Sequence, residues 1–390
     1  MKRRVGFMLI GGKDWTGGYN YLLNLVQVLA REAADRIEPV IFVGDDTTPE
    51  ETAPFSAAGV RAIERDPVFD RSVRTRLLAR ALLAGRDAAA EAALKRQGID
   101  VVFEAAAFLG WRSAVPAIAW IPDLQQRFLP HLFSRMAILR RETGFRAQIA
   151  SGRVVMCSSD DTRHHIERLY RGARGRVHAV RFAVLPGPAI ADAQARAVAD
   201  RHGLPDRYFF MPNQFWAHKN HRLVLQALQL LASEGRPVTV MASGRQHDPR
   251  DPTQVPRLLA DIGAASVQDH FRTPGLLPYE DLPALMQAST ALLNPSLFEG
   301  WSTTVEEAKS GGVPMLLSDL AVHREQADGA ATFFDPHSPR SLADALATFP
   351  PFDAAQRAES RQAAASRADA RIAQFAADFV HVVERAVARH

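Results

Sequence analysis

Cysteine is nearly absent from this chain of 390 residues, and its scarcity excludes two kinds of site. The single cysteine, Cys157, has no second cysteine with which to form a disulfide inside the chain. A metal site built from several cysteines is excluded for the same reason. Because Cys157 stands in the apolar segment 153–158, we expect it to be a buried packing residue at a strand end.

Long apolar runs are also absent. No stretch approaches the roughly 20 apolar residues that a membrane-spanning helix needs. The basic start is followed by a short apolar run that stops at Gly11 and Gly12, whereas a signal peptide has a longer run and a small-residue cleavage site. We therefore expect a cytoplasmic protein.

The chain has no large excess of charge of one sign. Its formal net charge is +4 at pH 7 and it has no block of consecutive like charges, so we expect no nucleic-acid partner. Residues 71–86 form a basic amphipathic pattern, which suits either an ordinary surface helix or a helix lying on anionic lipid. Only the second alternative implies a peripheral contact with the inner face of the cell membrane.

Short apolar strands alternate with amphipathic helices in both halves of the chain. The strands expected in the first half cover residues 4–10, 39–44, 99–104, 116–121 and 153–158. Those expected in the second half cover residues 208–212, 237–243, 291–295, 313–318 and 331–335. Strands that are apolar throughout are typical of parallel sheets with helices on both faces.

We predict an α/β fold with two doubly wound, Rossmann-like domains that face each other across a cleft, because the chain is too long for one ordinary core. The first domain is expected at residues 1–187 and the second at 188–370. An amphipathic terminal helix, 371–390, is expected to cross back to the first domain. Ligands in such sheets bind beyond the carboxyl ends of the strands, so candidate site residues are expected in those loops.

The most informative segment, 294–319, leaves an apolar strand and enters a helix near Thr303. Glu299 precedes this helix, and Glu307 lies eight residues later, about one turn inside it. The N-terminus of a helix offers free N–H groups and a positive dipole end, which suit a diphosphate. Gly300 allows a close backbone approach to a ligand.

The same segment also has a purely structural explanation. Ser302 or Thr303 is a suitable helix cap, Glu306 and Glu307 complement the helix dipole, and Gly311-Gly312 suits the end of the helix. Capping does not explain why Glu299 and Trp301 precede the helix. Spacing alone leaves both explanations open.

The spacing of Glu299 and Glu307, followed by Gly312-Val313-Pro314, resembles the C-terminal signature of retaining glycosyltransferases of the GT-B fold, family 4 type, also called group 1. The resemblance implies that Glu307 holds the ribose of a nucleotide-sugar donor. It also implies that Glu299 contacts hydroxyls of the transferred sugar. The backbone from Trp301 to Thr303, with the hydroxyl of Ser302, would hold the phosphates.

A second segment, 211–221, agrees with this resemblance. The family usually carries an arginine here and a lysine a few residues later, both on the donor diphosphate. Lys219 fits the lysine position, and the resemblance implies that it acts in catalysis together with Glu299 and Glu307. Gln214 stands at the arginine position and brings hydrogen-bond donors but no charge. A solvated lysine at a helix start is the alternative for Lys219.

Resemblance in the first half is weaker. Gly17 and Gly18, with the pair before them, are expected in the loop after the first strand, where the family has a glycine-rich loop facing the donor phosphates. Paired glycines alone are usually only a turn. The family often has His-Asp at the end of a later strand, but this chain has Pro122-Asp123. Asp123 and Gln126 are candidate acceptor contacts.

The resemblance implies a hexosyltransferase that moves a sugar from a nucleoside diphosphate sugar to a hydroxyl of a glycan or lipid-linked acceptor, with retention. Assembly of a cell-surface polysaccharide or lipopolysaccharide is the expected setting. No metal and no other cofactor is expected. A GT-B epimerase or phosphorylase, or a non-catalytic GT-B partner, stays an alternative.

Overall fold

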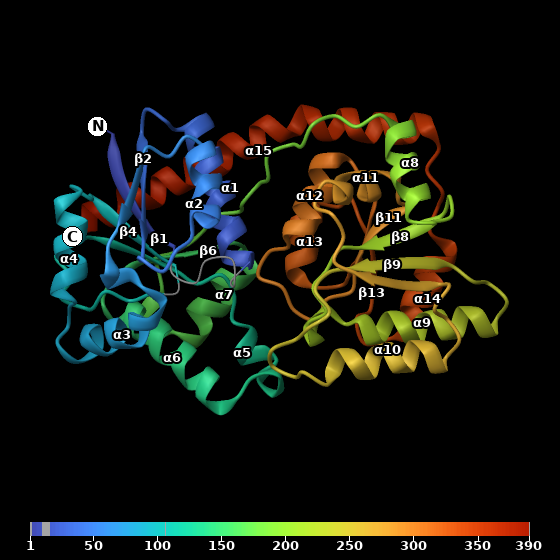
Figure 1. Cartoon of the computed structure of the whole chain (residues 1–390), viewed down its shortest axis with the longest axis horizontal. Helices are drawn as coiled ribbons and strands as arrows, with labels where there is room; N and C mark the ends of the chain where they lie inside the picture. The colour runs from blue at the N-terminus through green and yellow to red at the C-terminus, as the bar shows by residue number, and fades with distance from the viewer. Residues whose placement is uncertain (1, 10–15, 106, 390) are drawn as a thin grey trace. The chain divides into compact units, whose positions relative to one another are not determined.

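The computed structural model describes residues 2–9, 16–105 and 107–389. The chain divides into two compact units (Figure 1). The first unit comprises Met1–Leu124, Arg135–Leu185 and Ala370–His390, and the second comprises Gln125–Ser134 and Pro186–Asp369. The main division therefore lies at 185/186, against the predicted 187/188. Segment 125–134, which the prediction gave to the first domain, groups with the second unit.

The first unit is built on a seven-stranded parallel sheet in the order β3-β2-β1-β4-β5-β6-β7. Its strands are β1 (Arg3–Met8), β2 (Ile37–Val43), β3 (Ala62–Arg65), β4 (Val101–Ala105), β5 (Ala117–Trp120), β6 (Val154–Cys157) and β7 (Val177–Ala179). Its helices are α1 (Thr16–Glu32), α2 (Pro49–Ala57), α3 (Arg74–Leu83), α4 (Ala88–Arg96), α6 (Arg135–Ala150), α7 (Asp160–Leu169) and the last part of α15 (Ala354–Arg389). Short 3₁₀ turns are η2 (Pro67–Phe69), η3 (Arg71–Val73) and η5 (Arg171–Ala173).

Aromatic side chains hold the last turns of α15 in the first unit. Phe379 stacks on Phe7 of β1 with ring centroids 6.0 Å apart, and Tyr21 of α1 stacks on Trp120 of β5 at 4.3 Å. Phe375 lies 6.4 Å from the Tyr21 ring. Because these rings are all buried, residues 370–389 form part of this unit's core.

The structure of the first unit bears on the predictions made for the two glycine pairs and for Cys157. Gly17 and Gly18 lie in the first turn of α1, so the prediction that they belong to a loop was wrong. A 17-residue amphipathic helix tolerates two glycines at its start, where few intrahelical bonds are made. Gly11 and Gly12 lie outside the described residues. Cys157 is fully buried, as expected.

The basic amphipathic segment 71–86 forms η3 and α3, and part of its apolar face packs inward. Leu77 is 4% exposed and joins the core of the first unit, whereas Leu83 is 88% exposed. Core packing therefore accounts for part of the amphipathic pattern. Within the described residues, no helix combines the length and the apolar character needed to cross a membrane.

The second unit has a six-stranded parallel sheet in the order β10-β9-β8-β11-β12-β13. Its strands are β8 (Tyr208–Met211), β9 (Thr239–Ser243), β10 (Phe271–Gly275), β11 (Ala291–Asn294), β12 (Met315–Ser318) and β13 (Thr332–Phe334). Its helices are α5 (Gln125–Phe128), α8 (Asp192–Arg201), α9 (His221–Ser233), α10 (Gln254–Ala264), α11 (Asp281–Ala288), α12 (Thr303–Gly311), α13 (Ala321–Ala327), α14 (Pro339–Thr348) and the start of α15, with 3₁₀ turns η4 (Pro130–Leu132) and η6 (Ala217–Lys219).

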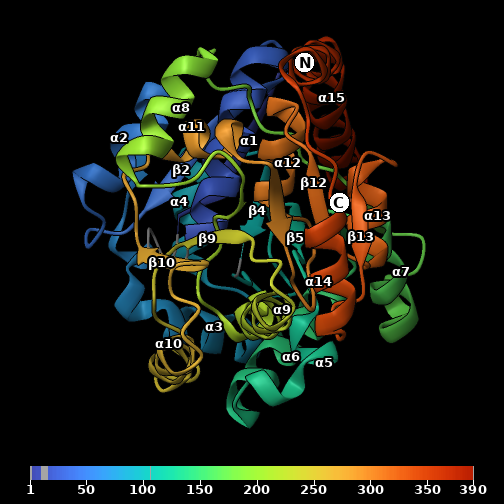
Figure 2. The same ribbon diagram turned by 90° about the vertical axis from the view of Figure 1, so that its right-hand side faces the viewer.

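Helices cover both faces of this second sheet (Figures 1 and 2). Helices α9, α10 and α14 pack on one face, and α8, α11 and α12 pack on the other. Each face has its own apolar cluster, which explains why the strands are apolar throughout. The two doubly wound α/β units agree with the predicted fold class.

Candidate functional site

The candidate site lies where the strand order of the second sheet reverses. The chain runs from β8 outward through β9 to β10, then returns to β11 beside β8 and continues outward through β12 to β13. Leu292 of β11 pairs with Phe210 of β8 in parallel register, so both strands end on the same edge. The loops after β8 and β11 diverge at this point, which is where doubly wound sheets bind ligands.

Lys219 and Glu299 join these two loops. Lys219 belongs to η6 after β8, and its Nζ lies 2.6 Å from Oε1 of Glu299, which follows β11. Their side chains are only 14% and 10% exposed. Ser296 Oγ lies 2.7 Å from the same carboxylate oxygen. Burial is the strongest single influence on Glu299 and opposes its ionisation. The charge and hydrogen bond of Lys219, with His218 and His323, together outweigh burial and hold the pKa of Glu299 below its ordinary value.

Backbone contacts fix the same two loops against each other. Leu297 N donates to the carbonyl of His218 at 2.8 Å, and Asn220 Nδ2 donates to the carbonyl of Pro295 at 3.1 Å. Asn220 has a φ of 61°, in the left-handed region that asparagine tolerates better than most residues. This turn lets η6 end with Lys219 facing Glu299 before α9 begins at His221.

The cap residue of α12 does not use its own side chain to cap the helix. Ser302 occupies the cap position, but its hydroxyl makes no capping bond and instead accepts from Asn294 Nδ2 at 3.0 Å. Buried Gln326 of α13 holds the backbone of Ser302 on both sides, with Oε1 3.0 Å from Ser302 N and Nε2 2.7 Å from Ser302 O. Capping by Ser302 therefore does not explain this segment.

The remaining residues predicted on this helix are placed around its start. Gly300 is buried, Trp301 is half-buried and Thr303 is exposed. Gly312 ends α12 with a φ of 63°, as expected for a left-handed C-cap, and a Cβ added there would lie 2.7 Å from the Arg361 backbone. The segment thus starts and ends as predicted, with its helix N-terminus beside Lys219 and Glu299.

Glu307 has a different environment from Glu299. It is an exposed residue one turn inside α12, yet surrounding protein raises the pKa of its carboxyl group to about 7. Tyr279 is an exposed residue, and the protein around it, followed by the charge of Glu307, raises the pKa of its hydroxyl group. The surroundings of Glu307 therefore disfavour the ionised form of its carboxyl group.

Gln214 is half-buried in the loop after β8, and the loop is packed tightly against the one after β9. A Cβ at Gly244 would lie 2.4 Å from the Asn213 carbonyl oxygen, so only glycine fits there. The β9 loop also brings Arg250 to His218, with Nη2 3.3 Å from Nδ1. Arg250 is a cation of the candidate site that the sequence analysis missed, because it lies some 30 residues away from Lys219 in another loop.

The two candidate acceptor residues belong to different units. Asp123 forms an ion pair with Arg141 of α6 in the first unit, at 3.0 Å. Gln126 is buried in α5, which groups with the second unit through the stacking of Phe128 on Phe298 at 5.2 Å. Asp123 thus groups with the first unit and Gln126 with the second, and a contact of either residue with an acceptor stays a prediction.

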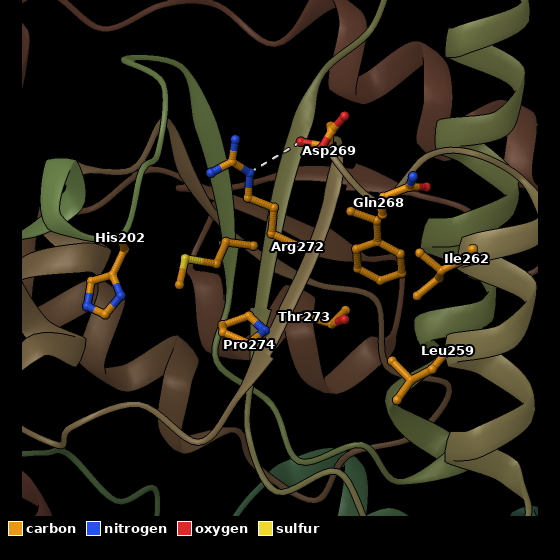
Figure 3. A pocket seen from close by; sticks show the side chains of 11 residues that line it. His202, Leu259, Ile262, Gln268, Asp269, Arg272, Thr273 and Pro274 are labelled. Atoms are coloured by element: carbon orange, nitrogen blue, oxygen red, sulfur yellow. Dashed lines mark hydrogen bonds between the residues drawn. The ribbon is translucent and has the colours of Figure 1, made fainter.

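A surface pocket of about 550 Å³ lies elsewhere in the second unit, at the edge strand β10 (Figure 3). Figure 3 shows His202 on one side of the strand and Leu259 and Ile262 of α10 on the other. None of the residues predicted to bind a donor lines it. Among the residues that the structure describes, no three His, Cys, Asp or Glu side chains are grouped to hold a metal ion, and the absence of a metal stays a prediction.

Part of the sequence is similar to known glycosyltransferases. Residues 197–364 match the family described as "Glycosyl transferases group 1". The chain is 26% identical over 227 residues to O-antigen chain mannosyltransferase B of Escherichia coli, and 32% identical over 128 residues to 2-deoxystreptamine glucosyltransferase of Streptomyces kanamyceticus. These matches cover 57% and 32% of this chain. The chain spans 58% and 32% of the length of these two relatives.

The fold is shared over nearly the whole chain. The crystal structure of Anabaena Alr3699/HepE in complex with UDP and glucose superposes with a TM-score of 0.72, covering 97% of this chain and 99% of that one at 14% identity. An identity this low shows the fold alone. The predicted GT-B fold class is confirmed. The segment that matches the group 1 glycosyltransferase model lies within the second unit.

Proposed function

We propose that the chain transfers a hexosyl group from a nucleoside diphosphate sugar to an acceptor hydroxyl, with retention at the anomeric carbon. The observation that carries this proposal is the Lys219–Glu299 pair beside the start of α12. It lies at the reversal point of the sheet, inside the segment that matches group 1 glycosyltransferases. A cation, free helix-end amides and a carboxylate are the groups that a diphosphate bonded to a sugar requires.

Each residue then has a separate task. Lys219 and the amides at the start of α12 stabilise the negative charge that develops on the leaving diphosphate. Glu299 accepts hydrogen bonds from hydroxyls of the transferred sugar, and Lys219 keeps it ionised for that purpose. Glu307 accepts bonds from the ribose. The leaving phosphate takes the proton of the acceptor hydroxyl, as the family resemblance implies.

The acceptor is proposed to be a glycan or a lipid-linked glycan, in cell-surface polysaccharide or lipopolysaccharide assembly. One relative is named for O-antigen chain mannosyl transfer and the other for glucosyl transfer to 2-deoxystreptamine, so hexose transfer to hydroxyl-rich acceptors supports the proposal. A cytoplasmic location, with a peripheral membrane contact for a lipid-linked acceptor, is part of the same proposal. No metal is assigned a role.

Turnover measured by mass spectrometry tests the proposal. The chain is incubated with UDP-, GDP-, ADP- and dTDP-hexoses and a panel of glycan acceptors, with and without EDTA. Formation of a glycosylated acceptor and free nucleoside diphosphate from one donor is expected. Conversion of the donor sugar without acceptor indicates an epimerase, and a requirement for free phosphate indicates a phosphorylase. Donor binding without any turnover indicates a non-catalytic partner, and each of these three results overturns the proposal.

A further inference from the structure

His218 precedes Lys219, and one side of its ring is held by Arg250. Nη2 of Arg250 lies 3.3 Å from Nδ1 of His218. A guanidinium group can only donate hydrogen bonds, so Nδ1 must be the acceptor and carries no proton. The proton of the neutral ring is then on Nε2. Arg250 therefore selects one tautomer of His218.

Arg250 is itself fixed by several contacts. Its Nε and Nη2 donate to the two carboxylate oxygens of Asp248, both at 2.9 Å, and Nη1 donates to Gln125 Oε1 at 3.0 Å. Asp248 is 1% exposed and also accepts from Ala217 N in η6 at 3.0 Å. A bidentate pair of this kind allows little rotation of the guanidinium plane. The orientation that selects the tautomer is thus part of the folded unit.

The ring is uncharged near neutral pH and lies close to the Lys219–Glu299 pair. Burial, and then the charge of Lys219, lower the pKa of His218 to about 3, although Glu299 acts in the opposite direction. The ring is 4% exposed, and no group in the described parts of the chain accepts a hydrogen bond from Nε2. His218 therefore presents an unused, neutral N–H donor at the candidate site.

We propose that His218 donates a hydrogen bond from Nε2 to a phosphate oxygen of the nucleoside diphosphate, and that Arg250 is the positioning residue that keeps the proton on Nε2. The inference rests on the proposed function and deepens it. Lys219 is already paired with Glu299, and Gln214 supplies no charge where the family has arginine. A donor aimed at the phosphate is worth more as negative charge develops there in the transition state.

Kinetics and binding test the role of His218. His218→Ala is expected to lower kcat about 10²-fold, which is the usual effect of removing one such donor. It is also expected to weaken binding of the free nucleoside diphosphate more than binding of the intact donor, because the free diphosphate carries more charge. The matched control is His337→Ala, which removes an exposed histidine whose backbone N–H, not its ring, bonds to Asp335. Unchanged kcat and nucleoside diphosphate affinity in His218→Ala overturn the inference.

The tautomer is tested directly by long-range ¹H–¹⁵N NMR of the full chain labelled at histidine, with His218→Ala used to assign the signal. A neutral ring protonated at Nε2 is expected from pH 6 to 8, and its Nε2 signal should shift when the diphosphate is added. Arg250→Lys should keep this tautomer and Arg250→Met should lose it. If Arg250→Met does not fold because Asp248 is left unpaired, the double variant with Asp248→Asn replaces it.

The two proposals fail in different ways. If UDP, GDP, ADP and dTDP all fail to bind the wild-type chain in calorimetry, the proposed function fails and this inference fails with it. If one of them binds but the His218 signal shows a proton on Nδ1, or a charged ring at pH 6, only this inference fails. A purely structural role for His218 would lower the thermal unfolding temperature without changing the ratio of the two affinities.

Discussion

Glu299 and Glu307 lie eight residues apart in one segment, but the folded chain lowers the pKa of the first and raises the pKa of the second. Glu299 is enclosed with Lys219, which together with His218 and His323 keeps its pKa low against the effect of burial. Glu307 is an exposed residue of α12, yet the protein around it raises its pKa to about 7. The folded chain favours the ionised form of Glu299 and disfavours the ionised form of Glu307. A carboxyl group with a raised pKa is a candidate for function.

The largest effect is expected from Lys219→Ala, which leaves Glu299 buried without its cation. Breaking a buried pair by removing one partner destabilises a protein by roughly 3 kcal/mol. Turnover is expected to fall at least about 10²-fold, since a group that stabilises the leaving diphosphate is lost. Urea unfolding and donor kinetics measure the two effects. Lys95→Ala, at an exposed lysine, is the control, and equal stability of both variants contradicts the account.

Glu299→Gln separates the charge of Glu299 from its shape. The folded pKa of Glu299 lies below the value of 4.5 taken for the free side chain, so its ionised form stabilises the fold above pH 4.5 and this stabilisation disappears as the pH falls through the folded pKa. The variant is therefore expected to be less stable than the wild type at pH 7, with a difference that shrinks in acid. Thermal unfolding from pH 3 to pH 8 measures it. A difference that does not depend on pH argues against the ion pair.

Glu307→Gln is expected to show the opposite sign. Because the folded pKa of about 7 exceeds the ordinary value of 4.5, ionisation destabilises the folded wild type progressively as the pH rises from 4.5 to 7. The variant should therefore be more stable than the wild type at pH 8 and equal to it below pH 4.5. Donor affinity should decrease in the same variant, because the amide no longer offers a charged acceptor to the ribose. A variant that is less stable at pH 8 contradicts this assignment.

The smallest effect is expected from Gln214→Arg. A cation at this half-buried position adds one charge near the proposed diphosphate, and we expect a Kd for the nucleoside diphosphate that is roughly two- to fivefold lower at low salt. Calorimetry at two salt concentrations measures it. Gln214→Glu is the matched change of opposite sign, and a gain in affinity with glutamate would show that position 214 does not face the phosphates.

The sequence was sufficient for the strands in the middle of each sheet and for the limits of α12. The three strands it missed, β3, β7 and β10, are all at sheet edges. Such strands are buried on fewer sides and need not be apolar, and β10 even contains Pro274. These three edge strands therefore lack the continuous apolar pattern on which the prediction depended, whereas the edge strand β13 has it and was predicted.

Some residues of the candidate site could likewise be predicted from the sequence, and others could not. Lys219, Glu299 and the start of α12 were predicted because they stand in two short motifs. Gln326 and Arg250 were not, since each acts through a contact between distant loops that no local spacing reveals. For the same reason the grouping of 125–134 with the second unit was not foreseen.

In the proposed mechanism, the Lys219–Glu299 pair and the start of α12 bind the diphosphate of a sugar donor. Isothermal titration of UDP, GDP, ADP and dTDP into the wild type and into Lys219→Ala tests it most directly. The account predicts that one nucleoside diphosphate binds the wild type and that Lys219→Ala, under conditions where it is folded, binds it at least about tenfold more weakly. Equal affinity in the two proteins would contradict the account.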